Sequence, residues 1–474
     1  MLFPTIEFGI FFPIVFVGAW LLRPSPVRWR LFLLGASYVF YGWLNPRFCF
    51  LLAGSTVANH VFARLIARFR RTGVRRSVLT LAIVANLAAL GYFKYYGFFA
   101  TSAREALSHV GVHLSPPLLE IVLPIGISFF TFQALTYVID TWRGTVRPVS
   151  LLDFAVYLSF FPHLVAGPIV RASEFLPQLR GRGDPRAIDS SRAFRLIVAG
   201  LFKKVVVSSY LASSIVDPVF AAPNNHSALD VIFAVYGYAI QIYADFSGYT
   251  DIAIGCALLL GITFPPNFAS PYAATSLQDF WHRWHMTLSR FLRDYLYVPL
   301  GGNRGSAART HRNLILVMVI GGLWHGAAWT FVVWGSIHGG VMAFERWVPE
   351  RRRALGFPEP RNTARHQVMR WVLTFHVVCL AWIFFRSPNF GVAGEMLGRL
   401  VTGWGTSTIV TPMVLFTIVA MLASQFVPEG AVENVQARLS YLPLVAQGAL
   451  LAGAFCVIDA LGPVGVAPFI YFQF

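Results

Sequence analysis

Long apolar runs recur along the whole chain, and they constrain its fold more than any other feature. The sequence has 474 residues, of which 56% are hydrophobic and only 12% are charged, about half of the charged fraction of a soluble domain. An apolar stretch satisfies its backbone in lipid only as a helix or a closed barrel. A barrel shows short alternating segments, whereas these runs are continuous. The sequence therefore predicts an all-α polytopic membrane protein and excludes an ordinary soluble enzyme and a disordered chain.

The basic excess has a simple explanation in this setting. Lys and Arg number 38 against 21 Asp and Glu, which gives a formal net charge of +17. In a soluble protein this charge would suggest a nucleic-acid partner. Here the basic residues fall in short loops between apolar runs, which is the positive-inside pattern of membrane proteins. The charge therefore indicates a membrane orientation, with the N-terminus outside, and no nucleic-acid partner.

The alternation of apolar runs and basic loops predicts a single membrane-embedded domain over residues 1–474. We expect N-terminal spans in 1–140, a core that carries the chemistry in 194–347, and C-terminal spans in 369–474. About eleven or twelve transmembrane helices are expected, arranged with re-entrant and interfacial helices around a central cavity.

One apolar stretch, residues 151–169, breaks the alternation because both of its flanks are rich in arginine. A full crossing would place one of the two arginine clusters outside. Pro162, Gly167 and Pro168 also interrupt any helix in its second half. We therefore expect a re-entrant element, which enters and leaves on the cytoplasmic side and is received by protein or a water-filled cavity.

Residues 279–295 combine aromatic and basic side chains. Read as one helix, the segment places six apolar residues on one face: Trp281, Trp284, Leu288, Phe291, Leu292 and Tyr295. Most of its charged residues, with His282, lie on the other face, and His285 lies at the edge of the apolar one. The pattern is typical of an interfacial helix on the cytoplasmic surface.

Residues 313–347 are mostly apolar, with basic residues at both ends. As helix they would measure roughly 52 Å, which is less than two crossings of a hydrocarbon core about 30 Å thick. The segment is therefore predicted to form a shallow hairpin, or to cross where the bilayer is thinned, with His325 about 12 residues into it and within the membrane.

A titratable side chain inside the bilayer is costly, so His325 is a functional candidate. It is flanked by glycines and alanines, which let a substrate or another helix approach its ring. A histidine that merely hydrogen-bonds a neighbouring helix is an equal alternative. His338 on the returning arm and His285 complete a set of three histidines able to converge on one cavity. Zinc-ligand spacings are absent, so no bound metal and no bound cofactor are expected.

Four polar residues inside the predicted span 229–260 are candidates for the wall of a polar cavity: Asp245, Ser247, Tyr249 and Asp251. An ion or proton pathway would also use such carboxylates. Structural pairing of the two aspartates with a nearby arginine is the alternative. Lys203 and Lys204 lie at a predicted span end, where the side chains are expected to reach the membrane surface.

Three long motifs make the chain resemble the membrane-bound O-acyltransferase family. They are YADFSGYTDIAIG at 243–255, FWHRWHMTLSRFLRDYLYVPLGGNRG at 280–305 and GGLWHGAAWTFVVWG at 321–335. LPIGISFFTFQALTYVID at 123–140, SFFPHLVAGPI at 159–169 and the C-terminal FIYFQF also fit. The sequence is most similar to the branch that contains the alginate O-acetyltransferase membrane subunit and the peptidoglycan O-acetyltransferases, and less similar to the D-alanyl transferase of teichoic acid synthesis.

The resemblance implies an O-acyltransferase of the bacterial inner membrane. Its donor would be a cytoplasmic thioester, here acetyl-CoA, and its acceptor an envelope polysaccharide such as alginate, cellulose or peptidoglycan. A separate periplasmic partner, an acetyl-accepting or SGNH-type protein, is also implied. The catalytic histidine of the Trp-His-Gly motif maps to His325, and the second site position, in Arg-Trp-His, maps to His285.

The residues themselves agree with this chemistry. Imidazole titrates near neutrality, as a base or nucleophile for acyl transfer must, and a site inside the membrane excludes water. Next to the two histidines, Trp324, Trp284 and Arg283 are further candidates for substrate binding. Arginines on the cytoplasmic face suit the phosphates of coenzyme A, although the positive-inside pattern explains them equally well.

Three alternatives remain open at the level of sequence. The first is a D-alanyl or other acyl transferase of the same family. The second is a secondary transporter that uses Asp245, Asp251 and the buried histidines, although only one broken segment is visible where such a transporter would have paired ones. The third is a non-catalytic scaffold of an exopolysaccharide complex.

Overall fold

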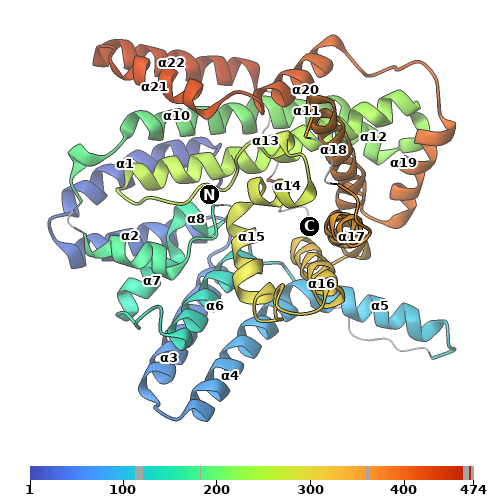
Figure 1. Ribbon diagram of the computed structural model, residues 1–474. Helices are drawn as coiled ribbons and strands as arrows, with labels where there is room; N and C mark the ends of the chain where they lie inside the picture. Colours follow the sequence, from blue (N-terminus) through green and yellow to red (C-terminus); the bar gives the residue numbers. More distant parts are fainter. Residues whose placement is uncertain (113–120, 166, 182, 359–361, 463–468, 471–474) are drawn as a thin grey trace. The chain divides into compact units, whose positions relative to one another are not determined.

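The computed structural model describes all residues except 113–120, 166, 182, 359–361, 463–468 and 471–474 (Figure 1). The described residues form helices and contain no strand, which confirms the predicted all-α class. Residues 113–120, within the predicted N-terminal spans of 1–140, and residues 471–474 of the FIYFQF motif lie outside the described residues.

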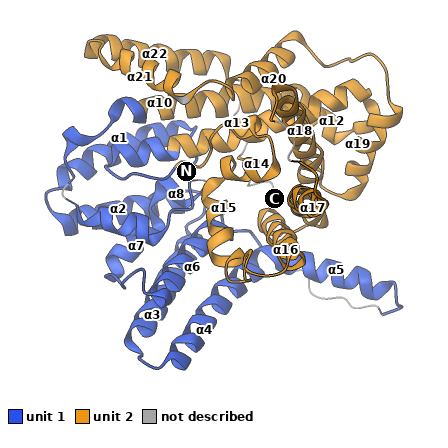
Figure 2. Cartoon of the chain, in the orientation of Figure 1, with its two compact units in different colours: residues 1–193, 253–265 blue, residues 194–252, 266–474 orange. Residues whose placement is uncertain are grey.

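The chain forms two compact units, which are described separately (Figure 2). Unit 1 contains residues 1–193 and 253–265, and unit 2 contains residues 194–252 and 266–474. The prediction of a single domain over 1–474 is not tested by this division and stays a prediction.

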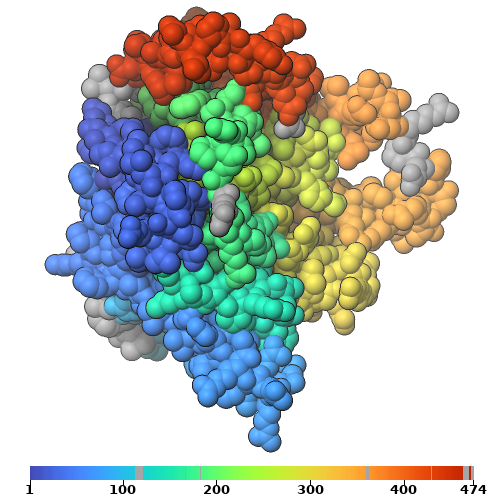
Figure 3. All heavy atoms as spheres, turned by 90° about the vertical axis from the view of Figure 1, so that its left-hand side faces the viewer, coloured from blue at the N-terminus to red at the C-terminus, as the bar shows by residue number. Residues whose placement is uncertain are grey.

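Six helical stretches among the described residues are long and apolar enough to cross a membrane: Arg47–Arg68, Thr72–Ser108, Ser190–Ala221, Ala228–Leu259, Ala364–Arg386 and Leu444–Leu461. Two shorter helices, Ile6–Leu22 and Pro412–Ser424, are also apolar. Many apolar side chains on them are exposed, as lipid contact requires: Leu444 and Val445 are 84% and 86% exposed, and Figure 3 shows the C-terminal helices (red) at the surface. The predicted multi-pass membrane architecture is confirmed, and the total of eleven or twelve spans stays a prediction.

Unit 1 contains nine α-helices among its described residues: α1 Ile6–Leu22, α2 Pro26–Gly42, α3 Arg47–Arg68, α4 Thr72–Leu90, α5 Tyr96–Ser108, α6 Ile127–Arg143, α7 Leu151–Ser159, α8 Phe161–Leu164 and α9 Ala172–Phe175. The break predicted within 151–169 is confirmed, since α7 ends at Ser159 and the short α8 begins just before Pro162. His163 is fully buried there, with Nε2 2.8 Å from the Tyr157 carbonyl oxygen. The re-entrant path through a membrane stays a prediction.

The helices of unit 2 continue the numbering: α10 Ser190–Leu201, α11 Ser209–Leu211, α12 Asp217–Ala221, α13 Ala228–Leu259, α14 Leu277–Arg283, α15 Met286–Leu292, α16 Ala307–His325, α17 Trp329–Ala354, α18 Ala364–Arg386, α19 Phe390–Thr402, α20 Pro412–Ser424, α21 Glu429–Ser440 and α22 Leu444–Leu461. The first residues of α10 and the last residues of α13 belong to unit 1.

Helices α16 and α17 form the hairpin predicted from residues 313–347, but both arms are longer than predicted. At about 1.5 Å per residue they measure roughly 28 and 39 Å. The predicted boundaries are wrong, because helical hydrogen bonding continues through the polar residues at both ends. The shallow path of the hairpin in the membrane stays a prediction. His325 is the last residue of α16 and lies at the turn of the hairpin.

Glycines bring the two arms of this hairpin into backbone contact. A Cβ atom at Gly322 or Gly335 would lie under 3.0 Å from the carbonyl oxygen of Phe331 or Met318. A Cβ atom at Gly339 would lie 2.7 Å from the Cα of the facing helix at Ile315. Small residues permit such close helix contacts in membranes, where van der Waals packing drives association. The turn that carries His325 therefore depends on these glycines.

We predict that Gly335→Ala lowers the thermal unfolding midpoint of the purified protein in detergent by several degrees, because the new methyl group collides with backbone that cannot move aside. Gly340→Ala is the matched control, since nothing lies within 4 Å of a Cβ atom there and alanine favours helix. Equal midpoints for the two variants would contradict the glycine contact.

Candidate active site

The segment predicted as one interfacial helix is two short helices with a sharp break at His285. Helix α14 ends at Arg283 and α15 begins at Met286. The φ angle of His285 is +42°, in the left-handed region, which costs a non-glycine residue about 1–3 kcal/mol. The predicted continuous helix is therefore wrong, although the predicted apolar face is buried at Trp281 and Trp284.

Asn267 holds this break in place. Its backbone carbonyl accepts the N–H of Met286 at 2.9 Å, and its side-chain Oδ1 accepts the N–H and the hydroxyl of Thr287 at 3.1 and 2.8 Å. The bonds that a continuous helix would make are thus replaced by bonds to a residue well before it in sequence. Such local compensation is what maintains a strained backbone.

The side-chain amide of Asn267 also determines which ring nitrogen of His285 carries the hydrogen. A backbone N–H only donates, so the Asn267 atom that faces Thr287 N is the oxygen. His285 Nδ1 lies 3.2 Å from this oxygen and therefore carries a hydrogen, which leaves a lone pair on Nε2. That Nε2 is buried and has no hydrogen-bond partner among the described residues. Burial also lowers the pKa of His285 to about 3, so the ring is neutral at physiological pH.

His325 lies beside His285 in an aromatic enclosure. The centroids of the two imidazole rings are 6.4 Å apart. Trp324, Trp334 and Phe385 surround His325, with centroids at 4.9, 5.3 and 5.3 Å. His325 is 2% exposed and His285 is fully buried. The structure thus brings the two histidines singled out by sequence into one water-poor site.

The third predicted histidine, His338, belongs to the same cluster but meets His325 through another ring. The indole of Trp334 lies 5.3 Å from His325 and 4.7 Å from His338, centroid to centroid. Trp281 Nε1 donates a hydrogen bond to His338 Nδ1 at 3.3 Å. Among the described residues, no three His, Cys, Asp or Glu side chains are placed to hold a metal ion.

The other predicted binding residues take different places. Trp324 is at the site, 5.9 Å from the His285 ring. Trp284 lies one layer behind, packed against Phe268 and Trp382 at 5.1 and 5.3 Å. Arg283 donates to the Asp279 carboxylate at 2.8 Å near the surface. The role of all three in substrate binding stays a prediction.

The two aspartates of α13 are paired with lysines of the preceding helical stretch. Asp245 pairs with Lys204, and Asp251 pairs with Lys203 at 2.5 Å. Lys204 is fully buried, so the prediction that both lysines reach the membrane surface is wrong. The expected partner of the aspartates was an arginine, and that is also corrected.

Backbone geometry explains why two consecutive lysines reach α13. Residues Phe202–Ser208 form a π-helical turn, which widens the helix. Gly200 and Gly248 let the two helices touch, since a Cβ atom at either would lie under 3.0 Å from the other's carbonyl oxygen. A charge inside a membrane protein is tolerated when it is paired in this way.

Ser247 and Tyr249, the remaining predicted residues of α13, lie beside these lysine–aspartate pairs. Lys203 Nζ donates to Ser247 Oγ at 2.9 Å, and Tyr249 packs on Phe469 at 4.4 Å. The N–H of Ile470 donates to Asp245 Oδ2 at 2.8 Å. These bonds favour the structural reading of the polar residues, and their part in substrate binding stays a prediction. Phe246 lies between Asp245 and Ser247 in the sequence and packs edge-on against His285, with ring centroids 4.7 Å apart.

Sequence reasoning missed two polar residues that support the site, Asn267 and Glu345. Both carboxylate oxygens of Glu345 accept the N–H of Leu277, at 2.9 and 3.1 Å, so α17 anchors the first turn of α14. A signal for Glu345 was present, because it is the only acidic residue within 313–347. No comparable signal marks Asn267.

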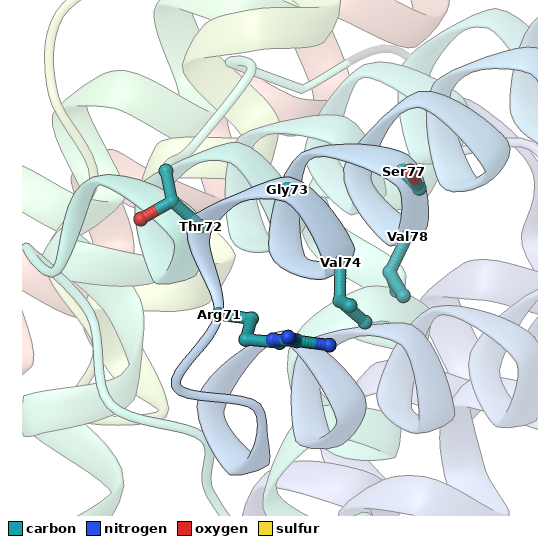
Figure 4. A pocket seen from close by; sticks show the side chains of 6 residues that line it. All are labelled: Arg71, Thr72, Gly73, Val74, Ser77 and Val78. Carbon is teal, nitrogen blue, oxygen red and sulfur yellow. The ribbon is translucent and has the colours of Figure 1, made fainter.

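A surface hollow of about 620 Å³ lies elsewhere, at the start of α4 in unit 1 (Figure 4). Its lining consists of Arg71, Thr72, Gly73, Val74, Ser77 and Val78. It contains none of the predicted site residues, and the central cavity expected from the sequence stays a prediction.

Comparison with known proteins identifies the family. Residues 111–386 match the model of the MBOAT, membrane-bound O-acyltransferase, family. The chain is 37% identical to a probable alginate O-acetylase AlgI of Azotobacter vinelandii over the full length of both. It is 42% identical to the probable alginate O-acetylase AlgI of Pseudomonas aeruginosa, over 84% of this chain and 74% of that protein.

A peptidoglycan O-acetyltransferase of Helicobacter pylori is 38% identical, over 82% of this chain and 78% of that protein. The chain belongs to the membrane-bound O-acyltransferase family. This MBOAT protein is an O-acyltransferase, and the resemblance carried by its three motifs is confirmed.

The buried neutral state of His285 predicts a pH dependence of stability. Its pKa is about 3 in the folded protein against an ordinary 6.5, so below pH 6.5 the unfolded chain binds more protons. Folding stability is therefore present above pH 6.5 and is lost as the pH falls, by about 2 kcal/mol at pH 5 from this residue.

Denaturant titrations in mixed micelles at pH 7 and pH 5 measure this loss. We expect His285→Gln to lose about 2 kcal/mol less than the wild type between these pH values. His282→Gln, at an exposed position on the preceding helix, should keep the wild-type dependence. An unchanged dependence in His285→Gln would show that its ring is not buried neutral.

Proposed function

We propose that this MBOAT protein is a polysaccharide O-acetyltransferase of the bacterial inner membrane. Acetyl-CoA on the cytoplasmic side is the donor, and the acetyl group passes toward an envelope polysaccharide. A periplasmic acetyl-accepting or SGNH-type partner receives it on the way. The observation that carries the proposal is the pair of buried histidines, His325 and His285, with ring centroids 6.4 Å apart.

The pair is suited to acyl transfer to a hydroxyl group. The acceptor hydroxyl donates its one hydrogen bond to His325, and the bare Nε2 of His285, whose ring centroid is 6.4 Å away, is left to accept from another N–H or O–H group of a substrate. His325 acts as the base that removes the hydroxyl proton. The oxygen then forms a bond to the thioester carbonyl carbon, the carbon–sulfur bond breaks, and the thiolate takes the proton from the His325 imidazolium.

The surroundings of the pair support this role. Trp324, Trp334 and Phe385 close around His325, and an apolar enclosure keeps water from competing with the acceptor hydroxyl. The strained backbone at His285 is typical of functional positions. Neither feature is needed by a scaffold that only holds other proteins.

Two of the alternatives are less well supported. A transporter would use Asp245 and Asp251 as titrating groups, but their carboxylates are paired with Lys204 and Lys203. A D-alanyl donor is less favoured than acetyl, because the relatives described above are named for O-acetyl transfer.

We predict that His325→Ala loses acetyl transfer by about 100- to 10,000-fold, the usual contribution of a positioned base. The assay uses purified protein in liposomes, labelled acetyl-CoA inside, and an alginate oligosaccharide with the periplasmic partner outside. His282→Ala, an exposed histidine near the site, should keep wild-type transfer. Wild-type rates in a folded His325→Ala variant would refute the proposal, and labelled D-alanyl donor used in preference to acetyl-CoA would refute its choice of acyl group.

A further inference from the structure

Helix α17 carries a row of three buried polar side chains, Thr330, Trp334 and His338, spaced four residues apart. This spacing puts them on one face of the helix. They are 2%, 0% and 0% exposed. The neighbouring row on α17 includes Gly335 and Gly339, which contact α16, so the polar row is not the surface that closes the hairpin.

Each member of the row has a buried polar atom with no hydrogen-bond partner among the described residues: Thr330 Oγ1, Trp334 Nε1 and His338 Nε2. Leaving such an atom unsatisfied costs about 1–3 kcal/mol. Most buried polar atoms in proteins have a partner. Three such atoms on one helix face, beside His325, are placed to bond a group held against that face.

The row is made of hydrogen-bond donors. An indole N–H only donates, so the bond from Trp281 Nε1 requires a bare nitrogen at His338 Nδ1. The hydrogen of neutral His338 is therefore on Nε2, which donates as Trp334 Nε1 does, while the Thr330 hydroxyl donates or accepts. His338 in this state does not act as a base, and its proton arrangement is opposite to that of His285.

The polar row of α17 lies next to His325. The Trp334 ring is 5.3 Å from the His325 ring and 4.7 Å from the His338 ring. Successive members are displaced by about 6 Å along the helix axis, so they meet oxygens spread along an extended molecule. Aromatic rings rather than charges line the row, with Trp281 5.7 Å from Trp334 and 5.4 Å from His338, and an unpaired anion would be poorly stabilised there.

We propose that Thr330, Trp334 and His338 form a substrate subsite that binds uncharged oxygen atoms next to His325. This inference rests on the proposed function and adds a binding role for α17. Two reactants carry such oxygens: the thioester donor, in the amide carbonyls of its arm, and the periplasmic acetyl acceptor, in its hydroxyl and backbone carbonyl groups. The subsite holds one of these so that its reacting end lies at His325.

The test removes single hydrogen-bonding groups, with the side-chain shape kept in Thr330→Val and the loss of ring volume in Trp334→Phe matched by a second Trp→Phe variant. Thr330→Val and Trp334→Phe each delete one hydrogen-bonding group, and Ser336→Ala and Trp382→Phe are the matched controls. Ser336 is exposed and donates to the Val332 carbonyl at 2.8 Å, and Trp382 Nε1 already donates to the Tyr272 hydroxyl at 3.2 Å. The acetyl-transfer assay then gives KM for acetyl-CoA and KM for the periplasmic partner separately.

Loss of one neutral hydrogen bond should raise one of the two KM values about 3- to 10-fold in each subsite variant, with both controls within twofold of wild type. A rise in KM for acetyl-CoA assigns the subsite to the donor arm, and a rise in KM for the periplasmic partner assigns it to the acceptor. Unchanged KM values for both substrates in Thr330→Val and Trp334→Phe would overturn the proposal.

A binding measurement separates failure of the subsite from failure of the proposed function. Saturating acetyl-CoA or periplasmic partner should raise the thermal unfolding midpoint of wild-type protein more than that of the Thr330→Val/Trp334→Phe double variant. This readout needs no turnover. Equal shifts in the two proteins, or no shift in either, would overturn the subsite even if acetyl transfer is observed.

Discussion

The backbone contact between α16 and α17 is the constraint on which the site depends. Gly322 and Gly335 allow the two helices to approach until each backbone touches the other. Only three residues connect the two helices, and His325 is the last residue of α16 before this turn. The polar row of α17, Thr330, Trp334 and His338, lies next to Gly335 and Gly339 on the same helix. The contact between α16 and α17 therefore also sets how the polar row approaches His325. A larger residue at Gly335 or Gly339 would therefore move His325 and the polar row together.

The second part of the site is built by exchanging regular structure for specific bonds. His285 is held in a left-handed conformation by Asn267, whose single oxygen serves Thr287 and the imidazole together. The hydrogen bonds to His285 and His338 have opposite consequences. Asn267 leaves a lone pair on Nε2 of His285, whereas Trp281 leaves a hydrogen on Nε2 of His338. One histidine is thus prepared to accept and the other to donate. Two residues of the same type acquire different chemistry from one neighbour each.

Much of this was predictable from the sequence, because the relevant signals are local. Apolar runs predict the helices, and the cost of a buried imidazole singles out His325. The break in 151–169 follows from its prolines and glycine. The position of His285 at the edge of an apolar face correctly indicates that its ring points inward.

The predictions that the structure corrects concern contacts between residues that are apart in the sequence. The helix break at His285 requires an acceptor at Asn267, and nothing within 279–295 announces it. The pairing of Lys204 with Asp245 requires two helices to meet at glycines, so hydropathy alone predicted a side chain at the membrane surface. The length of the hairpin was underestimated because hydrogen bonds, and not apolarity, decide where a helix ends.

The central claim is that His325 and His285 act as one catalytic unit, and a double-mutant cycle on acetyl transfer tests it most directly. The rates of His325→Ala, His285→Ala and the double variant are compared with wild type under saturating acetyl-CoA. Groups that act together are strongly non-additive. The double variant should therefore lose no more activity than the more damaged single variant. Losses that multiply in the double variant would show that the two histidines act independently and would contradict this account.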